Sequence, residues 1–329
     1  MHSSRLSFVA LVAILSGACN SDTPPTRPLI IDVHLHALPA NAFDGVGPRP
    51  LAVCVGGFWP DFARRFPGLG ECRDSLIPPT TDDSLLQGTI AAMEQFNVIG
   101  VASGPLPVVR QWRRSAPRRI IPALLVDGSE SLDSVPQWVA DSTVSVLGEL
   151  LFQYAGLRPS DSLPEAWFAM AERLDAPIGI HVGPGAAGAA YAQAPTYRMA
   201  LSDPLLLEPT LIRHPRLRLY VMHAGWPMLD GMMGLLYAHP QVYIDVSVIN
   251  WMLPRAEFHT YLRRLVEAGF TKRIMYGSDQ MTWPASIARG IEAINTAPFL
   301  TERDKRDIFC NNAARFLRLD QPGSTFPRC

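Results

Sequence analysis

Segments with the patterns of strands and helices alternate along almost the whole chain, and this alternation limits its fold more than any other feature. Eight short runs rich in β-branched residues are predicted to be strands: residues 29–34, 98–103, 120–126, 144–151, 177–182, 217–223, 242–248 and 273–278. Amphipathic segments predicted to be helices lie between them: residues 83–96, 164–174, 203–213, 228–238 and 255–268, with weaker patterns at 105–114 and 134–141. Strands that alternate with helices form a parallel sheet, and eight such units match the size of a (β/α)8 TIM barrel. We therefore predict an α/β protein with a single (β/α)8 barrel domain over residues 29–329; a doubly wound open sheet is the alternative.

One connection in this pattern is much longer than the others. Residues 37–81 separate the first predicted strand from its helix, and four aromatic residues lie there between Cys54 and Cys72. A loop of this length in a compact domain usually has a function. We predict a disulfide-stapled lid over the mouth of the barrel, with a surface excursion packed on its own aromatic residues as the alternative.

Side chains that bind metals follow four of the predicted strands. His34 and His36 close the first strand, His181 ends the fifth, His223 ends the sixth, and Asp279 follows the eighth. Any one of them alone is as well explained by a buried histidine or a capping aspartate. The carboxyl ends of barrel strands meet at one face, however, and residues two apart in a strand point the same way. Imidazole and carboxylate groups gathered there predict a site for Zn²⁺ or a similar divalent ion.

Glu149 lies within the otherwise apolar fourth strand. A buried carboxylate without a partner would be costly, and a metal ion would compensate it. We predict that Glu149 is a metal ligand that can bridge two ions; a role behind the ligands or a pairing with arginine is the alternative.

This set of residues resembles the amidohydrolase superfamily, specifically its amidohydrolase-related branch, over residues 29–319. The resemblance implies a (β/α)8 barrel, one or two divalent ions, and hydrolysis of amides, esters, lactones or phosphoesters. In many two-metal members a carboxylated lysine after the fourth strand bridges the ions, and here Glu149 stands at that strand. Whether the chain binds one ion or two therefore stays open.

The ligand set suggests a mechanism. A divalent ion lowers the pKa of bound water and polarises the carbonyl group under attack. The resemblance and its position at a strand end give Asp279 the role of moving the proton from the water to the leaving group. His223 is either a metal ligand or, if only one ion binds, a group that stabilises the developing oxyanion.

Residues next to the predicted ligands are candidates for binding the substrate, and most of them are aromatic. The candidates are Gln153, Tyr154, Arg198, Trp226, Trp251 and Trp283. An aromatic pocket with one arginine suits a small organic substrate, and Arg198 can hold a carboxylate of such a substrate through two hydrogen bonds. Loop packing is the alternative for each of these residues.

The first residues have the features of an export signal. Arg5 precedes an apolar run at residues 6–15 that is too short to span a bilayer, and small residues lead into Cys19. We therefore expect residues 1–18 to be removed.

Residues 15–19 also resemble a bacterial lipoprotein signal, which implies that Cys19 becomes the lipidated first residue. Cleavage without lipidation is the alternative. Residues 19–28 are polar and rich in proline and are predicted to be a tether. Asn20 after the cysteine favours, by resemblance to Gram-negative lipoproteins, the outer membrane within a periplasmic or cell-envelope location.

Export makes disulfides between the remaining cysteines possible, since they persist outside the cytosol. Cys54 and Cys72 share the long loop, and Cys310 lies within reach of a tail that ends in Cys329. We predict the pairs 54–72 and 310–329 among the three possible connectivities, with buried free thiols as the alternative.

The composition narrows the possible partners. The chain has a formal net charge of −1, so no basic surface indicates nucleic acid, and a small molecule is the expected partner. Contact with a membrane is expected only through the lipid on Cys19, and the oligomeric state stays open. Two rival functions remain: a one-metal decarboxylase of an unsaturated or aromatic acid, which would not need Glu149, and an exported binding protein without catalysis.

Overall fold

The computed structural model describes residues 27–44, 51–56, 74–191, 194–321 and 325–329. At its centre is a sheet of eight parallel strands in the order β1-β4-β5-β6-β7-β8-β9-β10. Their bounds are Ile30–His36 (β1), Val98–Gly104 (β4), Ile120–Val126 (β5), Val146–Leu150 (β6), Ile178–His181 (β7), Leu219–Met222 (β8), Tyr243–Asp245 (β9) and Ile274–Met275 (β10). Each of the eight predicted strands is present, and the predicted (β/α)8 barrel is confirmed.

Main-chain hydrogen bonds close this sheet between its first strand and the segment that includes and follows its last. The Val33 N–H donates to the carbonyl of Tyr276 at 3.0 Å, and the Asp279 N–H donates to the carbonyl of His34 at 2.7 Å. The second bond brings the end of β1 beside the residues after β10. Segments more than 240 residues apart in the sequence therefore meet at the face where the predicted ligands lie.

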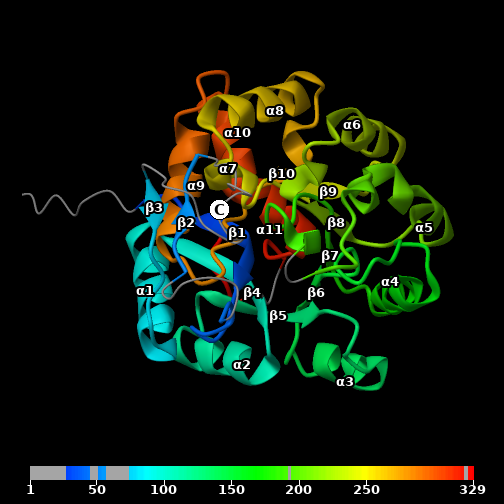
Figure 1. Cartoon of the computed structure of the whole chain (residues 1–329), viewed down its shortest axis with the longest axis horizontal. Helices are drawn as coiled ribbons and strands as arrows, with labels where there is room; N and C mark the ends of the chain where they lie inside the picture. The colour runs from blue at the N-terminus through cyan, green and yellow to red at the C-terminus, as the bar shows by residue number, and fades with distance from the viewer. Residues whose placement is uncertain (1–26, 45–50, 57–73, 192–193, 322–324) are drawn as a thin grey trace, which may run out of the picture.

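Helices surround the strands, as Figure 1 shows. Their bounds are Asp82–Gln95 (α1), Leu106–Ser115 (α2), Val135–Ala140 (α3), Ser162–Leu174 (α4), Glu208–Arg213 (α5), Leu229–Ala238 (α6), Ile249–Met252 (α7), Arg255–Glu267 (α8), Ala285–Asn295 (α9), Glu302–Arg306 (α10) and Asn312–Leu317 (α11). Apolar side chains from strands and helices fill the layer between them, with Leu85, Trp112, Trp167 and Phe258 fully buried or nearly so. None of the helices in the described residues is long and apolar enough to cross a membrane.

The continuous helix predicted over residues 203–213 is wrong. A 3-10 helix at Pro204–Leu207 precedes α5, which begins at Glu208. Pro209 lies in the first turn of α5 and has no N–H to donate to a carbonyl one turn earlier. The α-helical bonding pattern therefore restarts at this point instead of running through it.

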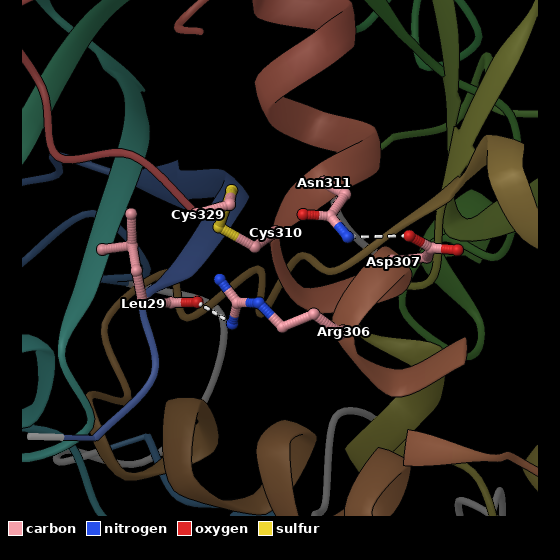
Figure 2. Close-up of a disulfide and its surroundings, with 6 residues drawn as sticks. All are labelled: Leu29, Arg306, Asp307, Cys310, Asn311 and Cys329. Atoms are coloured by element: carbon pink, nitrogen blue, oxygen red, sulfur yellow. Dashed lines mark hydrogen bonds between the residues drawn. A yellow bond between two sulfur atoms is a disulfide. The ribbon is translucent and has the colours of Figure 1, made fainter. Parts of the chain in front are cut away.

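The C-terminal segment closes the barrel at the end where the strands begin. Cys310, Ala313, Ala314 and Phe316 pack on inward-facing strand residues, and the Arg306 side chain donates to the carbonyl of Leu29 at 2.6 Å. Figure 2 shows Arg306 and Leu29 beside the disulfide of Cys310. The predicted pair Cys310–Cys329 is confirmed by this disulfide, which joins the chain's last residue to the segment that closes the barrel.

The long connection after β1 lies at the opposite end of the barrel in the parts that the structure describes. It contains two short antiparallel strands, Val53–Cys54 (β2) and Ser75–Leu76 (β3). The carbonyl of Leu51 accepts from the indole of Trp283, and the Gly56 N–H donates to the carbonyl of Trp251. Cys54 is disulfide-bonded, but Cys72 and the four aromatic residues lie outside the described residues, so the 54–72 pair and the lid stay predictions.

Candidate metal centre

The first group of predicted ligands meets at the ends of β1 and β10. His34 Nε2 lies 3.2 Å from His36 Nε2, so the two imidazoles meet on the same side of β1. Asp279 Oδ1 is 3.0 Å from His36 Nε2 and 3.8 Å from His34 Nε2. Glu149 reaches the same place from β6, with Oε2 at 3.5 Å from His34 Nε2 and 3.3 Å from His36 Nε2. Two nitrogen and two oxygen atoms therefore converge here.

The second group meets on the other side of Glu149. Its other oxygen, Oε1, lies 2.6 Å from His181 Nδ1 and 3.4 Å from His223 Nε2. The two imidazole nitrogens are 3.0 Å apart. All three side chains are nearly fully buried. Each oxygen of the Glu149 carboxylate thus faces a different pair of histidines.

The donor atoms fit divalent metal ions. Two sets of three ligand atoms within 4.8 Å of one another contain Glu149, one with His34 and His36 and one with His181 and His223. A third set, of His34, His223 and Asp279, crosses between the two groups. Imidazole nitrogen and carboxylate oxygen are the ligands of catalytic zinc sites and of related divalent ions. Glu149 belongs to two of the three sets, with a different pair of histidines in each. The geometry therefore matches a carboxylate shared by two ions.

Protons occupy the first group in the absence of metal. Burial lowers the pKa of His36, but hydrogen bonding and attraction from Asp279 and Glu149 outweigh it and raise the pKa to about 9. The pKa of His34 is held well above its usual value by the same carboxylates, again against burial. Burial raises the pKa of Glu149, yet the surrounding histidines bring it well below its usual range. Ionised carboxylates therefore face cationic imidazoles, and a divalent ion would replace their protons.

Several residues that position the site have a left-handed backbone. The φ angle is 59° at His223, 55° at Val248 and 49° at Asp279. Such values are uncommon for residues other than glycine and are unfavourable for β-branched residues such as valine. They occur one residue after β8, three after β9 and four after β10, where the chain leaves the barrel wall. The sharp turns aim His223 and Asp279 inward.

Two aspartates that we did not single out from the sequence lie directly behind the ligands. Asp245 on β9 places Oδ2 3.2 Å from His34 Nδ1 and accepts from the His223 N–H at 3.0 Å. Asp32 on β1 accepts from the His34 N–H at 3.0 Å. Both are charged residues within apolar predicted strands, which is the signal that marked Glu149. The same reasoning would have found them.

Three neutral residues also contact the ligands, and no sequence signal marked them. Ser247 Oγ lies 2.8 Å from His34 Nδ1, and Ser103 Oγ lies 3.3 Å from His36 Nδ1. Gln280 accepts from the His36 N–H and donates to the His36 carbonyl. Serine and glutamine are common at strand ends and in loops, so only the folded barrel identifies these three.

Tyr154 is the predicted substrate residue that the structure places against a ligand. Its ring meets the His181 ring edge-on, with centroids 5.0 Å apart, and lies 5.1 Å from the ring of Tyr197. Gln153 is buried and donates to the carbonyl of Gly183 and to the hydroxyl of Ser202. Tyr154 therefore forms a wall beside the second group, while Gln153 ties together the loops around it.

The other predicted substrate residues use their polar groups within the protein. The Arg198 guanidinium is exposed and donates to the carbonyls of Pro195 and Tyr197, each at 2.7 Å. The indole N–H groups of three tryptophans donate to protein acceptors: Trp226 to Glu257, Trp251 to Ser278 and Trp283 to Leu51. Trp251 and Trp283 are also nearly fully buried. Their part in substrate binding stays a prediction.

The family of the chain follows from its sequence as a whole. A model of the amidohydrolase family matches residues 31–319, which is most of the 329 residues. The chain therefore belongs to the amidohydrolase family, and the resemblance drawn from the histidines at the strand ends is confirmed. No curated protein matches the chain.

Solved structures show the same fold at low sequence identity. An uncharacterised TIM-barrel protein from Bordetella bronchiseptica has a TM-score of 0.63 and 17% identity, over 88% of this chain and 99% of that one. A probable 2-pyrone-4,6-dicarboxylic acid hydrolase from Acinetobacter baumannii, with citric acid bound, has 0.57 and 15% over 88% and 99%. A dihydroxybenzoic acid decarboxylase from Polaromonas sp. JS666, with bound manganese and an inhibitor, has 0.58 and 12% over 90% and 99%. These likenesses support the barrel and extend to both hydrolases and decarboxylases.

Proposed function

We propose that this protein is a two-metal hydrolase that cleaves an ester, lactone, amide or related bond of a small organic molecule. The observation that carries this proposal is Glu149, whose two oxygens face two different pairs of histidines. One ion would be held by His34, His36 and Asp279, and the other by His181 and His223, with Glu149 shared. Zn²⁺ is the ion we propose; Mn²⁺ is the alternative, because a structural neighbour holds it.

When bound, such ions would activate a water molecule as the nucleophile and polarise the carbonyl group of the substrate. Asp279 has an ionised carboxylate, because attraction from His34 and His36 outweighs burial and lowers its pKa. Its Oδ1 lies 3.0 Å from His36 Nε2 and, once an ion replaces the proton on that nitrogen, would be free to accept the proton of the attacking water. Asp279 would then donate this proton to the leaving group.

The charge of the centre also favours hydrolysis with two ions. Glu149, Asp245 and Asp279 are buried carboxylates whose pKa values are lowered against burial by the neighbouring histidines. One divalent ion would leave this group of charges net negative, and two would make it net positive. A net positive centre stabilises the oxyanion that forms when water attacks a carbonyl group. Tyr154 would line the side of the pocket next to His181.

The test combines metal analysis with a substrate panel on the Glu149→Gln variant. We expect two ions per chain in the wild type, one in the variant, and at least a hundredfold loss of kcat on the substrate that the wild type hydrolyses. Esters, lactones, amides and phosphotriesters would form the panel. Glu165→Gln, which alters a carboxylate paired with Arg213 outside the centre, is the matched control. One ion in the wild type, undisturbed by Glu149→Gln, would overturn the two-metal proposal.

Decarboxylation is the second candidate, because one of the compared structures is a dihydroxybenzoic acid decarboxylase. In that case the first group alone would hold one ion, and Glu149 would act without a second one. The hydrolase and the decarboxylase are distinguished by measuring CO₂ release from dihydroxybenzoates or other aromatic acids, with the protein loaded with one ion per chain. Turnover of these acids with no hydrolysis in the panel would favour the decarboxylase.

We also propose that the protein is exported and anchored by a lipid on Cys19. The disulfide Cys310–Cys329 supports an oxidising compartment. Cell fractionation of a bacterium expressing the full chain, with metabolic labelling by a fatty acid, tests the anchor. We expect label in the membrane fraction with the wild type and none with Cys19→Ser; an unlabelled wild-type protein would refute lipidation.

A further inference from the structure

The two groups of ligands share a second connection besides Glu149, on the side that faces the barrel wall. Ser247 follows β9 and is fully buried. Its Oγ lies 2.8 Å from His34 Nδ1 and 3.1 Å from His223 Nδ1. These two histidines belong to different groups of ligands. One hydroxyl therefore contacts the rear nitrogen of one imidazole in each group.

The direction of the hydrogen bonds follows from the number of protons. Ser247 Oγ is 2.6 Å from Asp245 Oδ1, and an ionised carboxylate can only accept. The single hydroxyl proton therefore goes to Asp245. The lone pairs of Ser247 Oγ then accept N–H groups from His34 Nδ1 and His223 Nδ1. Both imidazoles thus keep a proton on Nδ1, so Nε2 is the nitrogen that would bind a metal ion once the ion displaces any proton there.

The Nε2 atoms of His34 and His223 point toward the other ligands, as protonation of Nδ1 requires. His34 Nε2 faces His36 and Glu149 Oε2, and His223 Nε2 faces His181 and Glu149 Oε1. Asp245 fixes the serine from two sides, since its Oδ1 also accepts the Ser247 N–H at 2.9 Å. The same oxygen accepts the His223 N–H at 3.0 Å.

We propose that Ser247, held by Asp245, is a positioning residue shared by both halves of the metal centre. It sets in His34 and in His223 the tautomer and ring orientation that present Nε2 to an ion. This inference rests on the proposed two-ion centre, and it adds that a neutral residue outside both ligand sets controls the affinity for each ion.

A matched control exists on the same face of the barrel. Ser103 is also a buried serine, and its Oγ lies 3.3 Å from His36 Nδ1 and donates to the carbonyl of Leu35. It contacts one ligand of the first group only. Removing its hydroxyl would disturb one half of the centre, whereas removing that of Ser247 would disturb both.

The experiment titrates the metal-free full chain with Co²⁺ and follows both the binding isotherm and the visible absorption of the bound ion. Each histidine keeps one further acceptor without the serine hydroxyl, Asp245 Oδ2 for His34 and the Ser247 carbonyl for His223. We therefore expect Ser247→Ala to weaken both binding steps by about tenfold. This is the lower end of the loss of metal affinity that follows when a hydrogen-bond partner of a metal ligand is removed. Ser103→Ala should weaken one step and leave the other unchanged.

Asp245→Asn provides a second variant in case Ser247→Ala does not fold. Its amide presents a donor to the serine hydroxyl or to His34 Nδ1–H, so it should also weaken both steps. If the wild type binds two ions but Ser247→Ala and Asp245→Asn each affect one step or none, the shared role of Ser247 is overturned and the two-ion centre stands. A wild type that binds a single ion would overturn the two-ion centre and this inference with it.

Discussion

Asp279 differs from Asp245 and Asp32 in that its carboxylate faces the Nε2 atoms of His34 and His36, the nitrogens proposed to bind an ion. Asp245 accepts from two main-chain N–H groups and a serine hydroxyl, and Asp32 accepts from the His34 N–H. Asp279 Oδ1 lies 3.0 Å from His36 Nε2 and 3.8 Å from His34 Nε2. Of these three, Asp279 is therefore the one placed beside the proposed ion, where it could move a proton.

We expect Asp279→Asn to lower kcat by at least about a hundredfold, because an amide cannot accept the proton of the attacking water. Its oxygen can still bind an ion, so most of the metal should remain. The measurements are kcat on the substrate found in the panel and metal content by elemental analysis. A variant with full metal and near-normal kcat would exclude Asp279 from proton transfer.

At the scale of elements, the C-terminal segment α10–α11, here called the plug, fills the end of the barrel where the strands begin. It packs Cys310 and Phe316 into the end of the barrel and bonds to the starts of two strands through Arg306 and Asn312. The disulfide to Cys329 closes a segment of 19 residues onto this plug. It lies beside Leu29, where β1 begins (Figure 2), whereas the ligands lie at the strand ends, so it should affect stability and leave the chemistry unchanged.

We expect Cys329→Ser to lower the free energy of unfolding by about 3 kcal/mol, from the loop entropy that the disulfide removes in the unfolded chain. Denaturant unfolding under oxidising conditions measures it. Under reducing conditions, which also open the disulfide of Cys54, the wild type and Cys329→Ser should be equally stable. Arg328→Ser, at the exposed neighbouring position, should show no loss under oxidising conditions. If Cys329→Ser and the wild type had the same free energy of unfolding under oxidising conditions, the disulfide would not stabilise the plug.

At the scale of the whole molecule, the centre joins side chains from β1, β6 and β7 and from the segments after β8 and β10. Without metal, its charges are balanced by protons, among them the one on His36, whose pKa is raised to about 9. A raised pKa means that the proton stabilises the metal-free fold fully below the unfolded value of about 6.5 and that this contribution is lost as the pH rises through about 9. Metal ions compete with that proton, so their stabilising effect should grow with pH over this range.

We expect a divalent ion at a hundred times its Kd to stabilise the fold by about 3 kcal/mol, which is roughly 4 °C in Tm for a chain of this size. At equal metal concentration the gain should be larger at pH 8 than at pH 6.5. Thermal unfolding with and without a chelator measures both. His36→Gln should lose most of the gain, while His214→Gln, whose imidazole pairs with Glu165 and Glu172 away from the centre, should keep it. A gain that falls with pH would contradict proton competition.

The sequence by itself determined the barrel and the residues that meet at its mouth. Hydrophobic periodicity identified eight strands. The carboxyl ends of all strands lie at one face of a (β/α)8 barrel, so the residues at those ends had to share that face: His34, His36, His181, His223 and Asp279. Glu149 could be found because a charge in an apolar strand needs a partner. The Cys310–Cys329 pair followed from the short distance along the chain.

Only the tertiary structure decided how these side chains divide between two groups. Whether Glu149 faces one pair of histidines or two depends on the stagger of strands and on side-chain directions, which a sequence pattern does not contain. The same holds for Ser247, whose hydroxyl meets His34 across 213 residues of sequence. It holds as well for Arg198 and the tryptophans, whose polar groups bond to nearby protein atoms. Periodicity assigns a residue to a face, but contacts between distant segments fix which atoms meet.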